Sequence, residues 1–442
     1  MRDSPRLVGL CFSFFLLFSS YFAAQNQVTP TLGDFGSLSL ALLYTTLAVV
    51  ACAAPAGFRR IQRLCAPHDM PERLRAETFA LAFSAFLYAP FPLACANESM
   101  HWAQLLASAV LGLGAGLLWV AQGSVLTACT TPANRGRWSG VFWASFMAGN
   151  AVGNFSSSAI VAHTSVSTMF VVLSGVAALS SLSFFVLVRP RRPSASTVSL
   201  EGGREILLPP RPTEPASLCT DLRTLLSVLR HRATLSLLPI LLFIGAENAF
   251  WGGEFPGLVS QLGGADSVGL VIGTLALSDM LCSVAAGLLV DQGAPTLALL
   301  GGLLAFGGSL ALVCLDLVPR IQHGSTADGS RLPASIFIAA ALMGAGDAAA
   351  NTVVLSRLGT LSDEAGVLPR ETAFQYFQVA NVAMTALGFV YAPLTPLDPA
   401  LGTVQYQPAL LIALGLAGGL GFCAVPAPRT AARLPTLQNV GS

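Results

Sequence analysis

Lysine is absent from this chain of 442 residues, and charged residues of all kinds make up only 10% of it. A soluble domain carries roughly a quarter charged residues, so this composition excludes an ordinary soluble protein. The missing lysine excludes a phosphate-binding P-loop, and His-Glu-x-x-His and Gly-x-Ser-x-Gly are missing too. We therefore expect a protein that is not an enzyme.

Metal-ligand spacing is also missing from the nine cysteines. Most of them lie inside apolar runs, which favours a packing role over a disulfide framework. The net charge of +1 gives no indication of nucleic-acid binding. We expect no metal, no cofactor and no nucleic-acid partner.

Apolar residues, in contrast, make up 54% of the chain, and the mean hydropathy is +0.68. Each of twelve apolar runs is long enough to cross ~30 Å of hydrocarbon as a helix with a rise of ~1.5 Å per residue. The runs cover residues 7–26, 37–57, 76–96, 103–127, 138–161, 167–188, 233–253, 266–290, 295–317, 333–355, 372–393 and 407–427. They predict a multi-pass protein of the lipid bilayer.

The first run has two interpretations. Arg2 and Arg6, the apolar core and the pair Ala23–Ala24 resemble a secretory signal with a small-residue cleavage site. The helix-compatible continuation through Gln25 and Asn26 favours a retained first helix, which we expect. The orientation of the chain is the same in both cases.

Arginine carries all the positive side-chain charge outside histidine. If the spans alternate in direction, 21 of the 23 arginines fall on one side of the membrane and only Arg320 and Arg331 on the other. The positive-inside rule then predicts that both termini are cytosolic. Asn97, in the sequon Asn97-Glu98-Ser99, falls in an outward-facing loop and is a glycosylation candidate.

Residues 189–232 divide the chain into two halves. This segment is rich in Pro, Arg and Ser and has no helical periodicity until about Leu222, so we expect a cytosolic, mostly disordered linker. The flanking regions, 1–188 and 233–428, are predicted to be six-helix bundles, and 429–442 a cytosolic tail.

Short sequence matches relate the two halves at a nearly constant offset. Ala24-Gln25-Asn26 matches Ala246-Glu247-Asn248, Gly114 and Gly116 match Gly344 and Gly346, and Phe146 and Asn150 match Phe377 and Asn381. Two parallel six-helix repeats are the pattern of major facilitator transporters, whose binding site lies at the repeat interface. The predicted fold class is therefore an all-α membrane protein of the major facilitator fold, with twelve transmembrane helices in two six-helix pseudo-repeats.

Three carboxyl groups interrupt the apolar runs: Glu247, Asp279 and Asp347. A carboxylate costs several kcal/mol to hold in hydrocarbon, so each is expected to face a partner or a water-filled cavity. The neutral polar residues expected to line the same cavity are Gln25, Asn26, Gln122 and Asn351. No Asp, Glu, Asn or Gln lies away from the ends of the predicted helices 37–57, 76–96, 167–188, 295–317 and 407–427. In a major facilitator bundle most of these helices support the others on the lipid side.

Counting the rise per residue gives an expected depth for each acid. Glu247 is predicted in the outer half of the membrane and Asp279 and Asp347 in the inner half, on opposite sides of the cavity midpoint. Asp347 and Asn351, four residues apart, share one helix face.

Three interpretations of these acids remain open. A buried carboxyl can bind and release a proton or cation during transport. It can instead form a hydrogen bond to a neighbouring helix, worth ~0.6 kcal/mol. In the third interpretation, it stabilises an inactive bundle that binds another membrane protein. The lack of a buried Arg or Lys counter-ion favours a protonated acid or a bound cation, and disfavours strongly anionic substrates.

Paired glycines indicate where helices approach closely. Gly149-x-x-x-Gly153 and Gly269-x-x-x-Gly273 have the spacing of close helix contacts. We expect packing rather than ligand binding at both.

Several motifs indicate a family. They are Phe22-Ala-Ala-Gln25-Asn26, Leu118-Trp119-Val-Ala121-Gln122-Gly123, Gly140-Val-Phe142-Trp143-Ala144, Gly245-x-Glu247-x-x-Phe250-x-x-Gly253 and Gly344-x-Gly346-Asp347-x-x-x-Asn351. Together they resemble the UNC-93-like branch of the major facilitator superfamily, and the second-half motifs are similar to its orphan type eleven members.

The resemblance implies two functions. Some family members are described as regulators of a potassium channel complex or escorts of innate immune receptors, and others as orphan transporter-like proteins. We expect a secondary transporter of a small solute, with Glu247 and Asp347 coupling transport to a proton or cation. The alternative is a non-transporting regulator or escort of an ion channel or receptor. The lack of long charged tails weakens that alternative.

Overall fold

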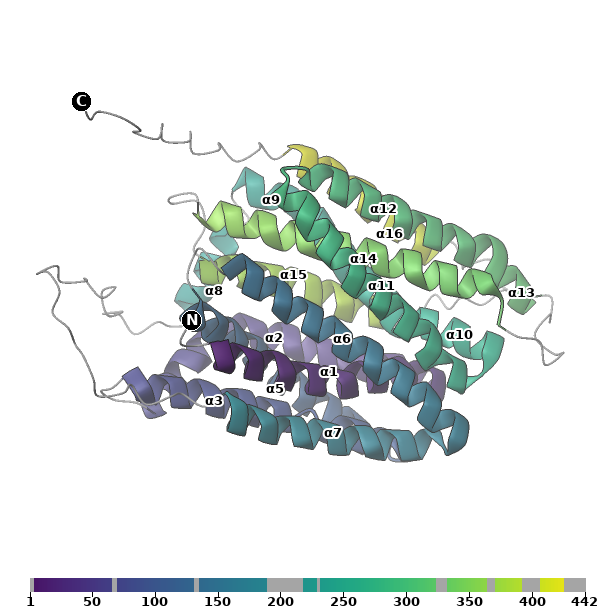
Figure 1. Cartoon of the computed structure of the whole chain (residues 1–442), viewed down its shortest axis with the longest axis horizontal. Coiled ribbons are helices and arrows are strands. Elements are labelled where there is room, and N and C mark those ends of the chain that lie inside the picture. Colours follow the sequence, from purple (N-terminus) through teal and green to yellow (C-terminus); the bar gives the residue numbers. More distant parts are fainter. Residues whose placement is uncertain are drawn as a thin grey trace, which may run out of the picture.

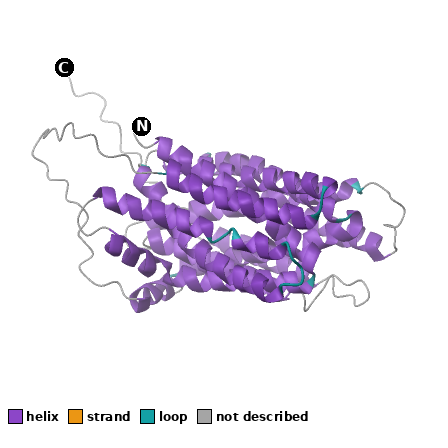
Figure 2. Ribbon diagram, turned by 90° about the horizontal axis from the view of Figure 1, so that it is seen from below, coloured by secondary structure: helices purple, strands orange, loops and turns teal. Residues whose placement is uncertain are grey.

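The computed structural model describes residues 4–65, 70–130, 135–188, 218–228, 231–322, 332–363, 370–391 and 406–424. Within these ranges the chain forms helices joined by short turns, with no strand. The helices run roughly side by side along the long axis of the molecule (Figures 1 and 2). The predicted tail at 429–442 lies outside the described residues, as does most of the predicted linker.

The first half contains seven helices within the described residues. They are α1 (Ser4–Leu32), α2 (Asp34–Cys65), α3 (Met70–Phe86), α4 (Pro90–Cys95), α5 (His101–Cys129), α6 (Arg135–His163) and α7 (Val166–Leu187). The predicted run 76–96 is divided between α3 and α4. Pro90 begins α4, because its missing N–H cannot continue the hydrogen-bond ladder of α3.

The second half contains longer composite helices. They are α9 (Arg232–Ala249), the π-helical turn η1 (Phe250–Glu254), α10 (Phe255–Gly263), α11 (Ala265–Asp291), α12 (Pro295–Leu312), the π-helical turn η2 (Val313–Leu317), α13 (Val318–Gln322), α14 (Ala334–Asp363), α15 (Arg370–Tyr391) and α16 (Tyr406–Ala424). The segments α9, η1 and α10 follow one another without a break, as do α12, η2 and α13. The described bundle therefore contains a helix at each of the twelve predicted runs.

One helix lies inside the predicted linker. Helix α8 (Leu218–Val228) begins four residues before the periodicity expected from Leu222. It packs against α2 of the first half and α15 of the second. The N-terminus and α8 lie at one end of the bundle, and α10 and α13 at the other, and we call these the α8 end and the α10 end (Figure 1).

Ten helices in the described ranges are long and apolar enough to cross a membrane. The chain is thus a multi-pass integral membrane protein. Helices α6 and α15 are not among the ten, although they occupy the predicted spans 138–161 and 372–393. Both carry several amide side chains, which lower their hydropathy.

Helix packing follows one pattern within each half. In the first half, α1 packs on α6 and α7, α5 packs on α2 and α3, and α3 packs on α7. In the second half, α9 packs on α15 and α16, α14 packs on α11 and α12, and α12 packs on α16. The halves meet along two further pairs, α6 with α11 and α2 with α15.

The two predicted glycine pairs are confirmed as close helix contacts. A Cβ at Gly153 of α6 would collide with the backbone of Ser19 in α1, and one at Gly269 of α11 with the backbone of Asn154 in α6. The first contact holds α1 and α6 together. The second lets α6 and α11 join the two halves.

Candidate functional site

The three predicted carboxyl groups come together in the second half. Glu247 on α9, Asp279 on α11 and Asp347 on α14 are each no more than 1% exposed. They lie near enough to act on one another electrostatically: Asp347 and Asp279 act on Glu247, and Asp347 acts on Asp279. We call these three residues the carboxyl triad.

The predicted separation of these acids in depth is wrong. It assumed that the seventh span ends near residue 253, which placed Glu247 close to the outer end. Instead the helix continues through η1 and α10 to Gly263, so Glu247 lies at its middle. Asp279 and Asp347 also lie near the middles of α11 and α14. All three acids therefore share one level of the bundle.

Neutral donors support only two members of the triad. Ser283 Oγ donates to Asp279 Oδ1 over 3.0 Å. Asn351 Nδ2 donates to Asp347 Oδ1 over 3.0 Å, which confirms the predicted shared face of these two residues. Neither oxygen of Glu247 receives an N–H or O–H donor from any described side chain or backbone group.

The charge of the triad is not balanced by a basic side chain. The charged groups that act on Glu247 and Asp279 in the described structure are all acidic or thiol groups. Burying ionised carboxylates together without a compensating positive charge is strongly unfavourable. The triad can therefore hold a proton or a cation.

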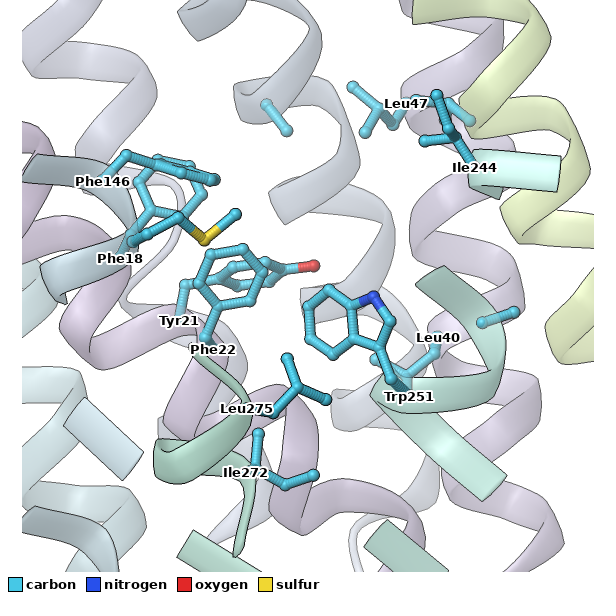
Figure 3. Close-up of a cluster of buried hydrophobic side chains, with 14 of the residues drawn as sticks. Phe18, Tyr21, Phe22, Leu40, Leu47, Phe146, Ile244, Trp251, Ile272 and Leu275 are labelled. Carbon is cyan, nitrogen blue, oxygen red and sulfur yellow. The ribbon is translucent and has the colours of Figure 1, made fainter. Parts of the chain in front are cut away.

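A group of rings lies next to the triad on the side of the α10 end. This aromatic cluster contains Phe18, Tyr21 and Phe22 of α1, Phe146 of α6 and Trp251 of η1 (Figure 3). The ring centroids of Phe22 and Trp251 are 5.8 Å apart, and this contact joins the two halves. Trp251 follows Glu247 by about one helical turn, so the cluster and the triad are adjacent levels of the same site.

Trp251 was not predicted from the sequence. It is 3% exposed, and its Nε1–H has no hydrogen-bond partner within the described ranges. The π-helical turn η1 positions it, and such turns occur often at functional sites. Its spacing of four residues from Glu247 is the sequence signal that identifies it, because such residues share a helix face.

Comparison with known proteins identifies the family. The profile of the UNC-93 family, described as ion channel regulatory protein UNC-93, matches residues 61–406. The chain belongs to the UNC-93 family.

Two relatives of this UNC-93 family chain are similar over most of their lengths. UNC93-like protein 3 of Arabidopsis thaliana is 27% identical over 412 residues, which cover 89% of this chain and 81% of the relative. UNC93-like protein MFSD11 of Xenopus laevis is 24% identical over 449 residues, covering 95% of each chain.

Solved structures of transporters share the fold of this family member. A peptide transporter POT in complex with sulfate matches with a TM-score of 0.60 at 13% identity, covering 95% of this chain and 93% of that one. A variant of the nucleoside transporter NupG matches with a TM-score of 0.64 at 12% identity, covering 96% and 99%. The fold is therefore that of major facilitator transporters.

Gln25 lies where the halves of the UNC-93 family chain close on each other. Its Oε1 accepts a hydrogen bond of 2.8 Å from Tyr44, whose hydroxyl also accepts one of 3.1 Å from Tyr21. A Cβ at Gly252 of η1 would collide with the Gln25 amide. Gln25 therefore contacts the second half directly at Gly252, the residue that follows Trp251.

Asn26 faces a neighbouring helix rather than the triad. Its Nδ2 donates to Asn154 Oδ1 over 3.1 Å, and Asn154 in turn donates to Asn150 Oδ1 over 2.7 Å. In the second half, Asn248 Nδ2 donates to Asn381 Oδ1 over 3.1 Å. Both contacts tie adjacent helices together.

The remaining predicted residues lie apart from the triad. Gln122 is buried on α5, a helix that does not carry any of the three acids. Asn97 is exposed in the turn between α4 and α5, and its Oδ1 accepts hydrogen bonds from the backbone N–H and hydroxyl of Ser99. The sequon is thus on the surface.

A buried ion pair was also missed. Arg6 directly precedes the predicted first span, yet it is 7% exposed and lies 3.6 Å from the Glu77 carboxylate. Its Nε donates to the backbone oxygen of Val188 over 3.0 Å, and Thr78 donates to the same oxygen. Arg6 thus joins α1, α3 and the end of α7, all within the first half.

Proposed function

We propose that this chain is a secondary transporter of a small solute, which works by alternating access between two six-helix repeats. Helix packing supports the repeats. When the spans are matched in order, the pairs α1–α6, α1–α7 and α3–α7 correspond to α9–α15, α9–α16 and α12–α16. The pairs α2–α5 and α3–α5 correspond to α11–α14 and α12–α14. Residues 1–188 and 233–428 are the proposed repeats, joined by the linker at 189–232.

The carboxyl triad is the observation that carries the transport proposal. Three buried acids that act on one another, with no described basic side chain acting on Glu247 or Asp279, can bind and release a proton or cation as access changes. Glu247 and Asp347 are the proposed coupling residues, and Asp279 and Asn351 complete the site. Gln25 and Gln122 are the proposed polar contribution of the first half.

Transport can be tested with the full-length protein in liposomes. We expect a panel of labelled small solutes to include one whose accumulation depends on an imposed proton or cation gradient. Asp347→Asn should abolish that accumulation, while Glu254→Gln, a carboxyl change outside the triad on the composite helix that carries Glu247, should leave it intact. A folded protein that moves no solute across a broad panel contradicts the proposal.

A second candidate is a regulator or escort of another membrane protein, because the matching family profile is described as that of an ion channel regulatory protein. In this case the triad stabilises the bundle and moves nothing. The full-length protein should then co-purify with a channel or receptor, and Asp347→Asn should leave that association unchanged.

The proposed orientation places both termini in the cytosol. An epitope tag at either end should become accessible to antibody only after the membrane is permeabilised. A tag that is accessible on intact cells or sealed vesicles of cell-surface orientation contradicts this topology.

A further inference from the structure

We propose that the transported solute is an organic cation, whose charged group contacts the carboxyl triad and whose apolar body contacts the aromatic cluster. This inference rests on the transport function proposed above and names its substrate class. It goes beyond ion coupling, because it assigns the solute itself to the acids and rings.

The charge of the site favours a positively charged group. All three ionisable groups of the triad are acidic, and no described basic side chain acts on Glu247 or Asp279. The buried Arg6 is paired with Glu77 in the first half. Arg357, on the same helix as Asp347, follows it by ten residues, or ~15 Å along the axis. An anionic group at the triad would therefore meet repulsion without a compensating cation.

The geometry favours an organic group over a metal ion. Within the described ranges, no group of three His, Cys, Asp or Glu side chains is arranged to hold a metal. Asp347 and Asp279 instead receive neutral side-chain donors, from Asn351 and Ser283. Glu247 has both oxygens without a donor, so it is the acid open to an ammonium group.

Trp251 gives an independent indication of a ligand. Its Nε1–H is buried without a partner, which is unfavourable unless a ligand or water accepts the hydrogen bond. In Figure 3 the indole nitrogen points toward the side of Ile244, and Glu247 lies between Ile244 and Trp251 on this helix. An indole donor and a carboxylate, both without a partner among the described groups, thus lie about one helical turn apart. A solute with an ammonium group and a nearby neutral oxygen satisfies both.

The aromatic cluster supplies a surface for the rest of such a solute. Rings attract cations through their faces and also bury apolar groups. Phe22 and Trp251 belong to different halves, with centroids 5.8 Å apart. A solute that inserts between these rings contacts both halves. Its binding separates Phe22 from Trp251, and alternating access requires such a change in the contacts between the halves.

Two soluble compounds with the same benzyl group test the charge preference directly. Binding of benzyltrimethylammonium and phenylmethanesulfonate to purified full-length protein in lipid nanodiscs can be measured by isothermal titration calorimetry. We expect the cation to bind and the sulfonate to show no binding. Equal or tighter binding of the sulfonate overturns the proposal, and this comparison needs no variant.

Variants then locate the binding site. Glu247→Gln should weaken binding of the cation by about tenfold or more, because it removes a negative charge that attracts the quaternary ammonium group. Trp251→Phe should weaken it by roughly threefold to tenfold, because it removes part of the cation–π attraction. Glu254→Gln is the matched control, with affinity within about twofold of wild type. Unchanged affinity in a monodisperse Glu247→Gln protein contradicts the assignment.

Flux measurements separate this inference from the transport proposal. If the cation binds in a Glu247-dependent way but does not cross the proteoliposome membrane, the binding site is supported and the transport proposal is contradicted. If a neutral or anionic solute is accumulated with dependence on Asp347, and the cation neither binds nor competes, transport stands and the substrate class is wrong.

Discussion

The two halves of the bundle bury different kinds of polar group. In the first half, Arg6 lies against Glu77, Gln25 accepts a hydrogen bond from Tyr44, and Asn26 donates one to Asn154. In the second half, three buried carboxyls lie near one another, and described side chains donate only to Asp279 and Asp347. Both halves contain buried polar atoms without a partner, so the difference lies in the acidic character of the second-half site. This difference supports the proposal that the second half holds the proton or cation.

Moving one carboxyl from the second half to the first should have the largest effect on gradient-driven uptake. Glu247→Gln is expected to reduce gradient-driven uptake to the level of protein-free liposomes. Adding Gln25→Glu at the matching position should not restore it, because Asp279 and Asp347 remain in the second half. Uptake assays on folded single and double variants check this. Recovery of uptake in the double variant would show that the position of the carboxyl does not matter.

Removing one partner of the first-half ion pair should affect stability rather than coupling. Arg6→Ala leaves the Glu77 carboxylate buried without its partner, which costs about 3–5 kcal/mol. Thermal unfolding of the detergent-purified protein should show a large loss of Tm. The gradient dependence of any residual uptake should be unchanged, and its loss would assign coupling to both halves.

Adding one carbon to the closest helix contact should have a smaller effect. Gly153→Ala forces α6 away from Ser19 of α1, at a cost of about 1–3 kcal/mol. Gly175→Ala on α7 is the matched control, because a Cβ there meets no atom within 4 Å. Equal thermal stability of the two variants would contradict the close packing of α1 on α6.

Removing either asparagine contact should have the smallest effect on thermal stability, and the effect should be similar in the two halves. Asn26→Ala and Asn248→Ala each remove one interhelical hydrogen bond, worth ~0.6 kcal/mol in a membrane. We expect small, similar decreases in Tm for both, with uptake retained. A loss of uptake in Asn26→Ala alone would support the prediction that Asn26 lines the cavity.

The positions of the helices could be predicted from the sequence because hydropathy and span length determine them directly. The three acids could be found in the same way, since a carboxyl in an apolar run is conspicuous. Their depth could not, because Gly252, Gly253, Glu254 and Pro256 interrupt the apolar run and conceal that η1 and α10 continue the helix to Gly263. The relation between Trp251 and Phe22 depends on the packing of distant segments, which no local pattern contains.

Two further features also escaped prediction for physical reasons. Helix α8 is short, and its contacts with α2 and α15 stabilise it, so composition alone favoured disorder. Arg6 lies near the start of the chain, directly before the first apolar run, and an arginine at such a position is ordinarily solvated. Its burial depends on Glu77 and Val188, which lie far away in the sequence.

The most direct test of coupling by the carboxyl triad compares one acid of the second half with one amide of the first. Accumulation of a transported solute in proteoliposomes is measured with and without an imposed proton or cation gradient, for wild type, Asp347→Asn and Asn26→Ala. We expect the gradient to stimulate accumulation in wild type and Asn26→Ala but not in Asp347→Asn. Full stimulation in Asp347→Asn would contradict the claim that the carboxyl triad of the second half performs the coupling.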